Sequence, residues 1–116
     1  MKTLVLPFVV AACAHRSSAM YRDDTAKLLA AKDAPIKACY ERVLRATPAA
    51  SGLVTVTFAI EKGTGKLVDA KVDNSASTAP DALVQCVTAE LAGLVLAPAD
   101  RRTGAARWSW DLRPGT

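Results

Sequence analysis

The alternating segment Gly52–Ile60 restricts the fold more than any other part of the chain. Its larger apolar side chains recur at every second position, which is the period of a strand with one buried face. These side chains are Val54, Val56, Phe58 and Ile60. A strand this apolar must be flanked on both edges and covered on one face, so we expect a sheet with 52–60 at its centre.

A turn that contains two glycines follows this strand. Residues 61–65 favour a tight hairpin connection, and 66–73 alternate as the antiparallel return strand. We expect the apolar side chains of this strand to face inward and the charged ones outward. The inward set is Val68, Ala70 and Val72, and the outward set is Asp69, Lys71 and Asp73.

Two helices are predicted from apolar side chains spaced three and four residues apart. The first starts at Asp33, a capping carboxylate two residues before Pro35, and ends at Thr47-Pro48. The second opens at 78–81, a sequence that resembles a capping box. The buried faces are Ile36, Cys39, Tyr40, Val43 and Leu44 in the first helix, and Leu83, Cys86, Val87, Leu91 and Leu94 in the second.

Residues 107–112 alternate again and supply a third strand. The side chains expected to face the helices are Trp108, Trp110 and Leu112, and those expected to face outward are Arg107, Ser109 and Asp111. The 116 residues suffice for one small domain. The predicted fold class is α+β: a three-stranded antiparallel sheet with two helices packed on one face, in the order α-β-β-α-β.

The N-terminal residues predict an exported and lipidated protein. Lys2 precedes an apolar stretch, 3–12, that is too short to cross a hydrocarbon layer about 30 Å thick. The stretch ends in Val10-Ala11-Ala12-Cys13, which resembles the bacterial lipobox. We therefore expect 1–12 to be a signal peptide and Cys13 to carry the lipid; the alternative is an ordinary signal peptide with a chance cysteine. Ala14 stands where a retention signal would place Asp, which favours the outer membrane, facing the periplasm.

Residues 13–32 are expected to form a polar, lipid-anchored tether. Asp23 or Asp24 would cap a short helix at 25–31 within it. A helix of that length needs tertiary contacts to persist. The domain itself is then expected to span 33–114.

Several of these features together resemble a known family. Ile36, Cys39 and Tyr40 on the first helix, the strand 52–60 with its glycine turn, and Cys86 on the second helix are similar to the AgmX/PglI C-terminal domain, known from gliding-motility proteins of myxobacteria. That domain is itself similar to the C-terminal domain of TonB. The resemblance implies a periplasmic protein-interaction domain with this helix and sheet arrangement. We expect no uncleaved membrane helix, Pro-rich spacer or cytoplasmic domain, and therefore no TonB-like energy transduction.

The cysteines of the two helices are expected to meet. Cys39 and Cys86 lie on the buried faces of helices that must pack on the same side of the sheet, and an oxidising envelope would join them in a disulfide. The alternative is two separate buried thiols that act as small apolar side chains. A metal or redox site is not expected, because no Cys-x-x-Cys spacing occurs and the single histidine is His15.

Catalysis, cofactors and nucleic acid are not expected either. His15 is two residues from the lipidation site, so no base is available beside a nucleophile. Asp69 and Asp73 flank Lys71 on the outward side of a strand, a pattern typical of a solvated face. The basic residues are scattered along the chain, unlike the clusters that bind nucleic acid.

We instead expect an envelope protein as the partner, bound by strand addition. Charges protect the edge strand 66–73, whereas 107–112 has fewer charges, and its outward residues are Arg107, Ser109 and Asp111. Two alternatives remain open: a structural scaffold lipoprotein of an envelope or motility complex that uses its helix face, and a small-ligand binder with Trp108 and Trp110 lining a pocket. Neither the partner's identity nor the oligomeric state follows from the sequence.

Overall fold

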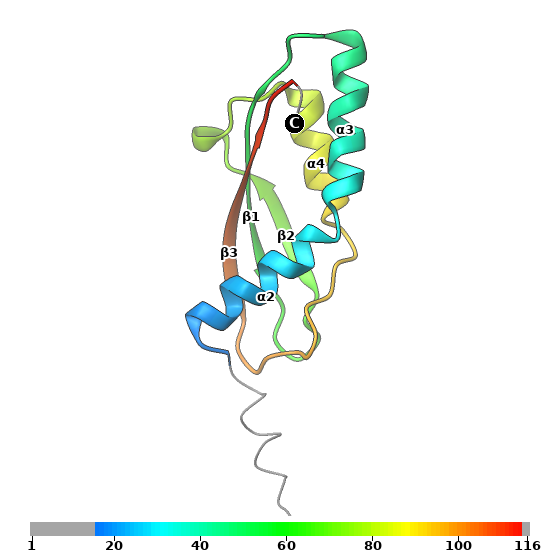
Figure 1. Ribbon diagram of the computed structural model, residues 1–116. Coiled ribbons are helices and arrows are strands. Elements are labelled where there is room, and N and C mark those ends of the chain that lie inside the picture. The colour runs from blue at the N-terminus through cyan, green and yellow to red at the C-terminus, as the bar shows by residue number, and fades with distance from the viewer. Residues whose placement is uncertain (1–15, 115–116) are drawn as a thin grey trace, which may run out of the picture.

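The computed structural model describes residues 16–114, so the predicted signal peptide 1–12 and Cys13 lie outside the described residues. Helices and strands follow one another in a mixed order along this part of the chain (Figure 1). They are α2 (Ser18–Ala30), α3 (Asp33–Ala46), β1 (Gly52–Ile60), β2 (Leu67–Val72), the 3-10 turn η1 (Asn74–Ala76), α4 (Asp81–Glu90) and β3 (Gly104–Leu112). The α+β class is confirmed, with one more helix than the predicted order contains.

The three strands form one antiparallel sheet in the order β2-β1-β3. β3 pairs with β1 along the whole of both strands, from Gly52 opposite Leu112 to Ile60 opposite Gly104. β2 pairs with β1 over a shorter stretch. The prediction that 52–60 is central, with the other two strands at the edges, is therefore confirmed.

The core lies between the sheet and the pair of helices α3 and α4. Val54, Val56, Phe58 and Ile60 of β1 are all buried there, as alternation predicted. On the helix side, Ile36, Cys39, Tyr40, Leu83, Val84 and Val87 are buried. A disulfide joins Cys39 to Cys86 with their Cα atoms 5.9 Å apart, which confirms the predicted pairing and links α3 to α4. Trp108 and Trp110 are half-buried against this core.

The predicted orientation of the β2 side chains is wrong at its first half. Asp69 has a φ of 56°, and the pairing with β1 shifts register at that point, as in a β-bulge. Leu67 therefore pairs with Ile60 on the core side, whereas Val68 pairs with Ala59 on the outer side. A bulge adds one residue and reverses the alternation, so only Ala70 and Val72 face inward as predicted.

None of the three predicted helix caps is present. Asp23 and Asp24 lie inside α2, which Ser17 caps instead. The N-cap position of α3 is Lys32, with Asp33 already helical, and no side chain caps that end. At α4 the N-cap position is Pro80. Thr78 instead accepts a hydrogen bond from the backbone N–H of Leu53 through its hydroxyl, at 2.9 Å. The start of β1, which includes Leu53, extends past the end of β2 and has no strand partner on that side. Its backbone N–H therefore binds the Thr78 hydroxyl, which is not left to cap the helix.

The predicted tether is largely a helix that packs on the domain. α2 starts at Ser18, seven residues before the expected helix, and Ser17 caps it by accepting from Met20 N at 3.2 Å. Thr25 and Leu29 of α2 are buried. These tertiary contacts stabilise a helix whose own sequence pattern is weak. Within residues 16–114, no helix combines the length and apolarity needed to cross a membrane.

Candidate interaction surface

The backbone direction in β1 determines which groups of β3 are free. Thr55 donates its N–H to Ser77 Oγ at 3.0 Å, and its carbonyl accepts from Asp73 N at 2.8 Å; both partners lie on the β2 side of β1. Successive residues of a strand direct their backbone groups to opposite sides. Val54 and Val56 therefore direct theirs towards β3.

The partners of these residues in β3 follow from the register. Val54 lies opposite Trp110 and Val56 opposite Trp108, so the two tryptophans use their backbone groups to bind β1. The residues that alternate with them direct N–H and C=O away from the sheet. These residues are Ala105, Arg107, Ser109 and Asp111. Within residues 16–114, no other segment forms a backbone hydrogen bond with them.

The side chain of Ser109 is already occupied on the outer face of the sheet. Its Oγ lies 2.7 Å from Oγ1 of Thr55, and Thr55 Oγ1 also donates to the carbonyl of Ala76 at 2.7 Å. Thr55 is only 1% exposed. At this position the free edge thus offers the backbone of Ser109, while its hydroxyl stabilises the sheet.

Charged side chains near this edge are paired within the chain. Arg107 extends across β1, and its Nη2 lies 3.0 Å from Oδ2 of Asp73. The pKa of Asp73 is lowered, chiefly by the hydrogen bond from the Ser75 side chain and further by the Arg107 charge. At the other end, Arg113 Nε donates to both carboxylate oxygens of Asp111 at 3.1 Å. These charges are therefore directed away from the middle of the edge.

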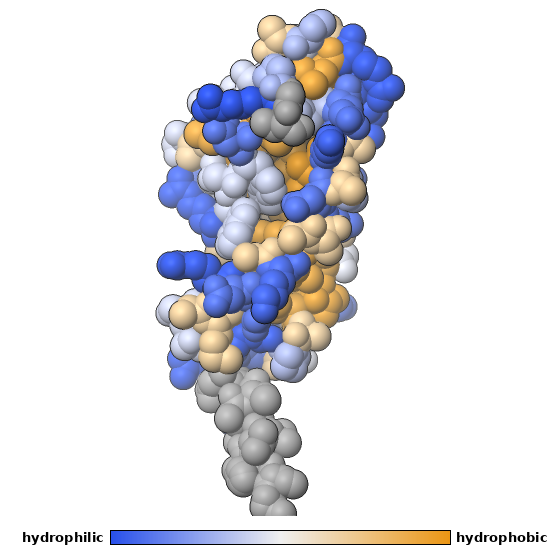
Figure 2. Space-filling view, viewed as in Figure 1, coloured by the Kyte–Doolittle hydropathy of each residue, from blue (hydrophilic) through white to orange (hydrophobic). Residues whose placement is uncertain are grey.

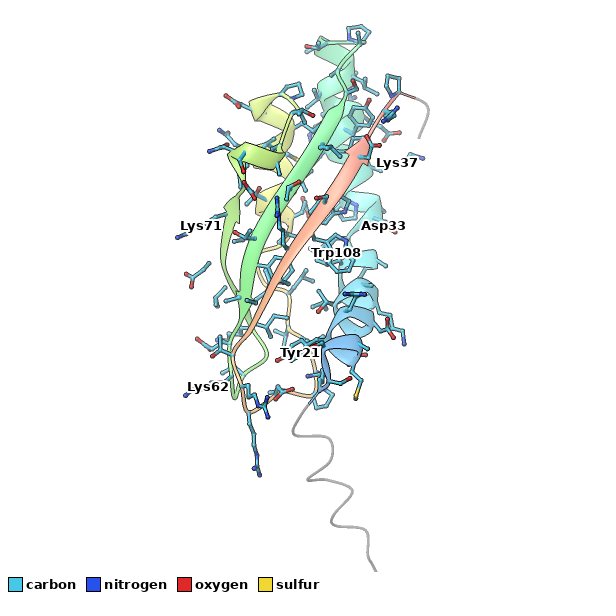
Figure 3. The ribbon with its side chains drawn as sticks, turned by 90° about the vertical axis from the view of Figure 1, so that its left-hand side faces the viewer. Tyr21, Asp33, Lys37, Lys62, Lys71 and Trp108 are labelled. Atoms are coloured by element: carbon cyan, nitrogen blue, oxygen red, sulfur yellow. A yellow bond between two sulfur atoms is a disulfide. The ribbon has the colours of Figure 1, made fainter. Side chains whose placement is uncertain are left out.

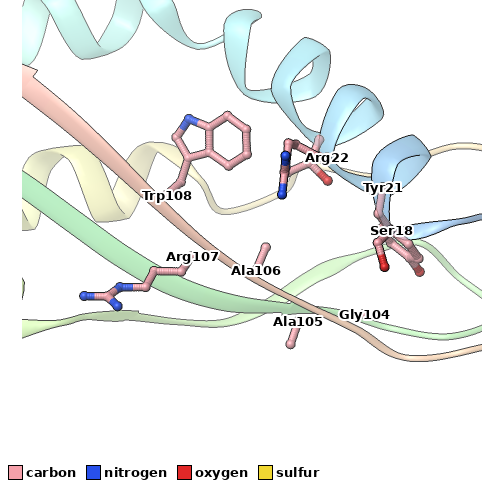
Figure 4. Close-up of a pocket in the computed structure, with 9 residues that line it drawn as sticks. Ser18, Tyr21, Arg22, Gly104, Ala105, Ala106, Arg107 and Trp108 are labelled. Carbon is pink, nitrogen blue, oxygen red and sulfur yellow. The ribbon is translucent and has the colours of Figure 1, made fainter.

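α2 limits access to the lower end of this edge. A groove of about 340 Å³ separates the helix from β3; it is lined by Ser18, Tyr21, Arg22 and Thr25 of α2 and by residues 104–108 (Figure 4). The Tyr21 ring lies so close to Gly104 that a Cβ there would come within 2.8 Å of it. Beyond the groove the edge is open, and Figure 2 shows pale, weakly polar surface along it between hydrophilic areas.

No family model matches this sequence, and comparisons with curated proteins and with solved structures give no match. The candidate surface therefore depends on the geometry of the chain itself. Among the described residues, no three His, Cys, Asp or Glu side chains gather as a metal site would require. What the geometry offers is a row of backbone donors and acceptors that can pair with an extended segment.

The structure brings together the three predicted edge residues and adds features that the sequence did not indicate. Arg107, Ser109 and Asp111 share the free edge and the outer face, as expected. The groove wall formed by Tyr21 and Arg22 was missed, because both residues fell in the segment interpreted as a tether. The Ser17 cap was the available signal for an earlier helix start.

Proposed function

We propose that this protein is a lipid-anchored component of the bacterial cell envelope that binds another envelope protein by adding a strand to β3. The free edge formed by Arg107, Ser109 and Asp111 is the observation that carries the proposal. An extended segment placed there would receive main-chain hydrogen bonds from every second residue of β3. The resulting sheet would have four strands, with the partner strand outermost.

β3 is better suited to receive a partner strand than β2 is, both in the length of its open edge and in its charge. The open stretch, 108–112, continues into the groove beside α2, where Trp108 forms part of the wall (Figure 4). An incoming strand would therefore be guided along the open stretch, and its end would meet α2. The other edge strand, β2, carries exposed Asp69 and Lys71 and a bulge, all of which discourage pairing.

The compartment is proposed from the N-terminal sequence and supported by the disulfide. Cys13 would carry the lipid after cleavage, in a protein that faces the periplasm from the outer membrane. The Cys39–Cys86 disulfide suits an oxidising compartment. The family proposed is that of the AgmX/PglI C-terminal domain, with a TonB C-terminal-like arrangement. On this account the protein acts by binding and not by catalysis.

A small-ligand function is the second candidate, because Trp108 lines the groove beside α2. A ligand that enters the groove would change the emission of this tryptophan, whereas strand addition further along β3 would also shift the amide signals of Ser109 and Asp111. Titration with small-molecule extracts, followed by fluorescence, separates the two. The scaffold alternative predicts amide shifts on the exposed faces of α3 and α4 instead.

The test begins in the native envelope and ends at β3. Crosslinking identifies what contacts the protein, and a peptide from the extended region of that partner is then added to the isotope-labelled chain. We expect the largest amide shifts at Ser109 and Asp111 in the open stretch and at Arg107 beside it, with smaller changes in β2. Shifts confined to the helices would favour the scaffold instead.

A further inference from the structure

The first described residue is fixed firmly to the domain. Arg16 donates its backbone N–H to Asp100 Oδ2 at 2.9 Å, and its side-chain Nε donates to Asp24 Oδ2 at 2.7 Å. The side chains of Arg16 and Asp100 are only 3% and 2% exposed. Arg16 therefore holds the start of α2 against the loop around Asp100.

This attachment is very close in sequence to the proposed lipid. Cys13 and Arg16 are three residues apart, so the chain between them can span at most about 11 Å in any conformation. The electrostatic screening length in about 0.1 M salt is a similar distance, about 10 Å. An acyl group on Cys13 would thus hold the end of the domain near Arg16 within the electrostatic field of the membrane surface.

The same end of the domain carries an excess of positive charge. The hairpin turn and the loop before β3 meet there, since Gly63 N donates to the carbonyl of Asp100 at 2.9 Å. Figure 3 shows Lys62 at this end, where α2 begins, and Lys37 on α3 in the other half of the molecule. Exposed cations from both segments form what we call the basic end: Lys62, Lys66, Arg101 and Arg102. In 61–66 and 100–103 only one carboxylate is exposed, that of Glu61, because Asp100 is buried.

We propose that the basic end is a membrane-contact surface that binds anionic phospholipid headgroups and so orients the domain. The inference rests on the proposed acylation of Cys13 and is independent of strand addition. Lysine and arginine side chains held near an anionic leaflet are attracted to it, and the attraction weakens with salt. With the basic end on the membrane, the long axis of β3 points away from it, and the open stretch 108–112 is presented to partners in the periplasm.

Lysine reactivity in vesicles tests this orientation. Full-length protein is extracted from membranes, its acylation is verified by intact mass, and it is placed in vesicles of phosphatidylcholine with or without phosphatidylglycerol. A water-soluble acetylating reagent then modifies the exposed lysines. We expect Lys62 and Lys66 to react about fivefold more slowly on the anionic vesicles, and Lys37 and Lys71 to react equally on both. High salt should remove the difference.

Charge reversal supplies the matched control. Arg101→Glu combined with Arg102→Glu should abolish the protection of Lys62, whereas Lys37→Glu combined with Arg45→Glu, both on α3 and away from the basic end, should leave it intact. If each of the four lysines of the acylated protein reacted at the same rate on both kinds of vesicle, this inference would be overturned, while the proposed anchor would stand. Protection that requires envelope proteins and is absent on anionic vesicles would also overturn it, in favour of an acidic protein. A chain without acyl groups would refute the anchor and, with it, this inference.

Discussion

The hydroxyl groups of Thr55 and Ser109 lie 2.7 Å apart, and this contact joins the central strand to the edge strand on the outer face of the sheet. It occurs at a position where the two strands form no backbone hydrogen bonds with each other, which is where facing side chains approach most closely. The same geometry directs the backbone N–H of Ser109 away from the sheet. One residue thus stabilises the edge through its side chain and leaves its backbone available.

Thr55→Val should destabilise the fold. The valine has the shape of threonine but leaves the Ala76 carbonyl and the Ser109 hydroxyl without their partner, at a site only 1% exposed. We expect a loss of about 1–3 kcal/mol in the free energy of unfolding, measured by urea denaturation. Ser109→Ala, which removes the more exposed hydroxyl of the pair, should cost less. Equal stability of Thr55→Val and the wild type would contradict the assigned contacts.

The disulfide should contribute strongly to stability. It closes a loop with a sequence separation of 47 residues, for which the chain-entropy relation gives about 4 kcal/mol. Replacing Cys39 and Cys86 together with alanine should lower the free energy of unfolding by a similar amount. Peptide mapping without reductant should recover the two cysteines as one linked species. Free alkylation of both in protein taken from the envelope would show that the bond does not form in the cell.

Two glycines in the hairpin provide a matched pair of substitutions. Gly65 has a φ of 75°, and a Cβ there would collide with the backbone carbonyl of Leu96; Gly63 has a φ of 80° but no atom within 4 Å of the added carbon. Gly63→Ala should lower the free energy of unfolding by only about 1 kcal/mol, the energy that a residue with a Cβ loses in a left-handed backbone conformation. Gly65→Ala should cost clearly more, since the backbone around Leu96 must move. Thermal unfolding that ranked the two variants the other way would contradict this geometry.

Acid should weaken the attachment of Arg16 to the domain. Burial raises the pKa of Asp100, but the backbone N–H groups of Arg102, Arg16 and Arg101 and the Arg16 charge outweigh it, so the pKa is lowered. A carboxylate with a lowered pKa stabilises the fold above its ordinary value, about 3.9, and this stabilisation is lost as the pH falls towards the folded-state pKa. Asp100→Asn should therefore be less stable at neutral pH and should show a shallower loss of stability in acid. If the stability of Asp100→Asn fell with decreasing pH as steeply as that of the wild type, the stabilising role of the Asp100 carboxylate would be contradicted.

The sequence predicted those parts of the fold whose signal is periodic. Alternation located β1 and most of β3, and the spacing of Ile36, Cys39 and Tyr40 located α3, because burial of one face dictates these patterns. It did not predict the bulge, since nothing in the sequence marks Asp69 as a non-glycine residue with positive φ. The cap predicted at 78–81 failed for a different reason: the backbone N–H of Leu53, at the start of β1, binds the Thr78 hydroxyl, which is a tertiary effect.

In the candidate surface, too, the periodic features were predictable from the sequence and the features that depend on tertiary contacts were not. Side-chain alternation predicted that Arg107, Ser109 and Asp111 share one face of the edge strand. Which of their backbone groups are free depends on the register between β1 and β3, and no sequence pattern specifies it. The groove beside α2 depends on packing of Tyr21 against Gly104, a contact between residues 83 positions apart. Such contacts appear only once the elements are assembled.

The most direct test of strand addition compares Ser109→Pro with Ser109→Ala for binding of the crosslinked envelope partner. Both remove the hydroxyl that binds Thr55, but only proline removes the outward N–H, and proline is tolerated at an edge position of this kind. We expect Ser109→Ala to bind like the wild type and Ser109→Pro to bind about tenfold or more weakly while it remains folded. Equal binding by a folded Ser109→Pro protein, with no amide shifts along β3, would contradict strand addition at this edge.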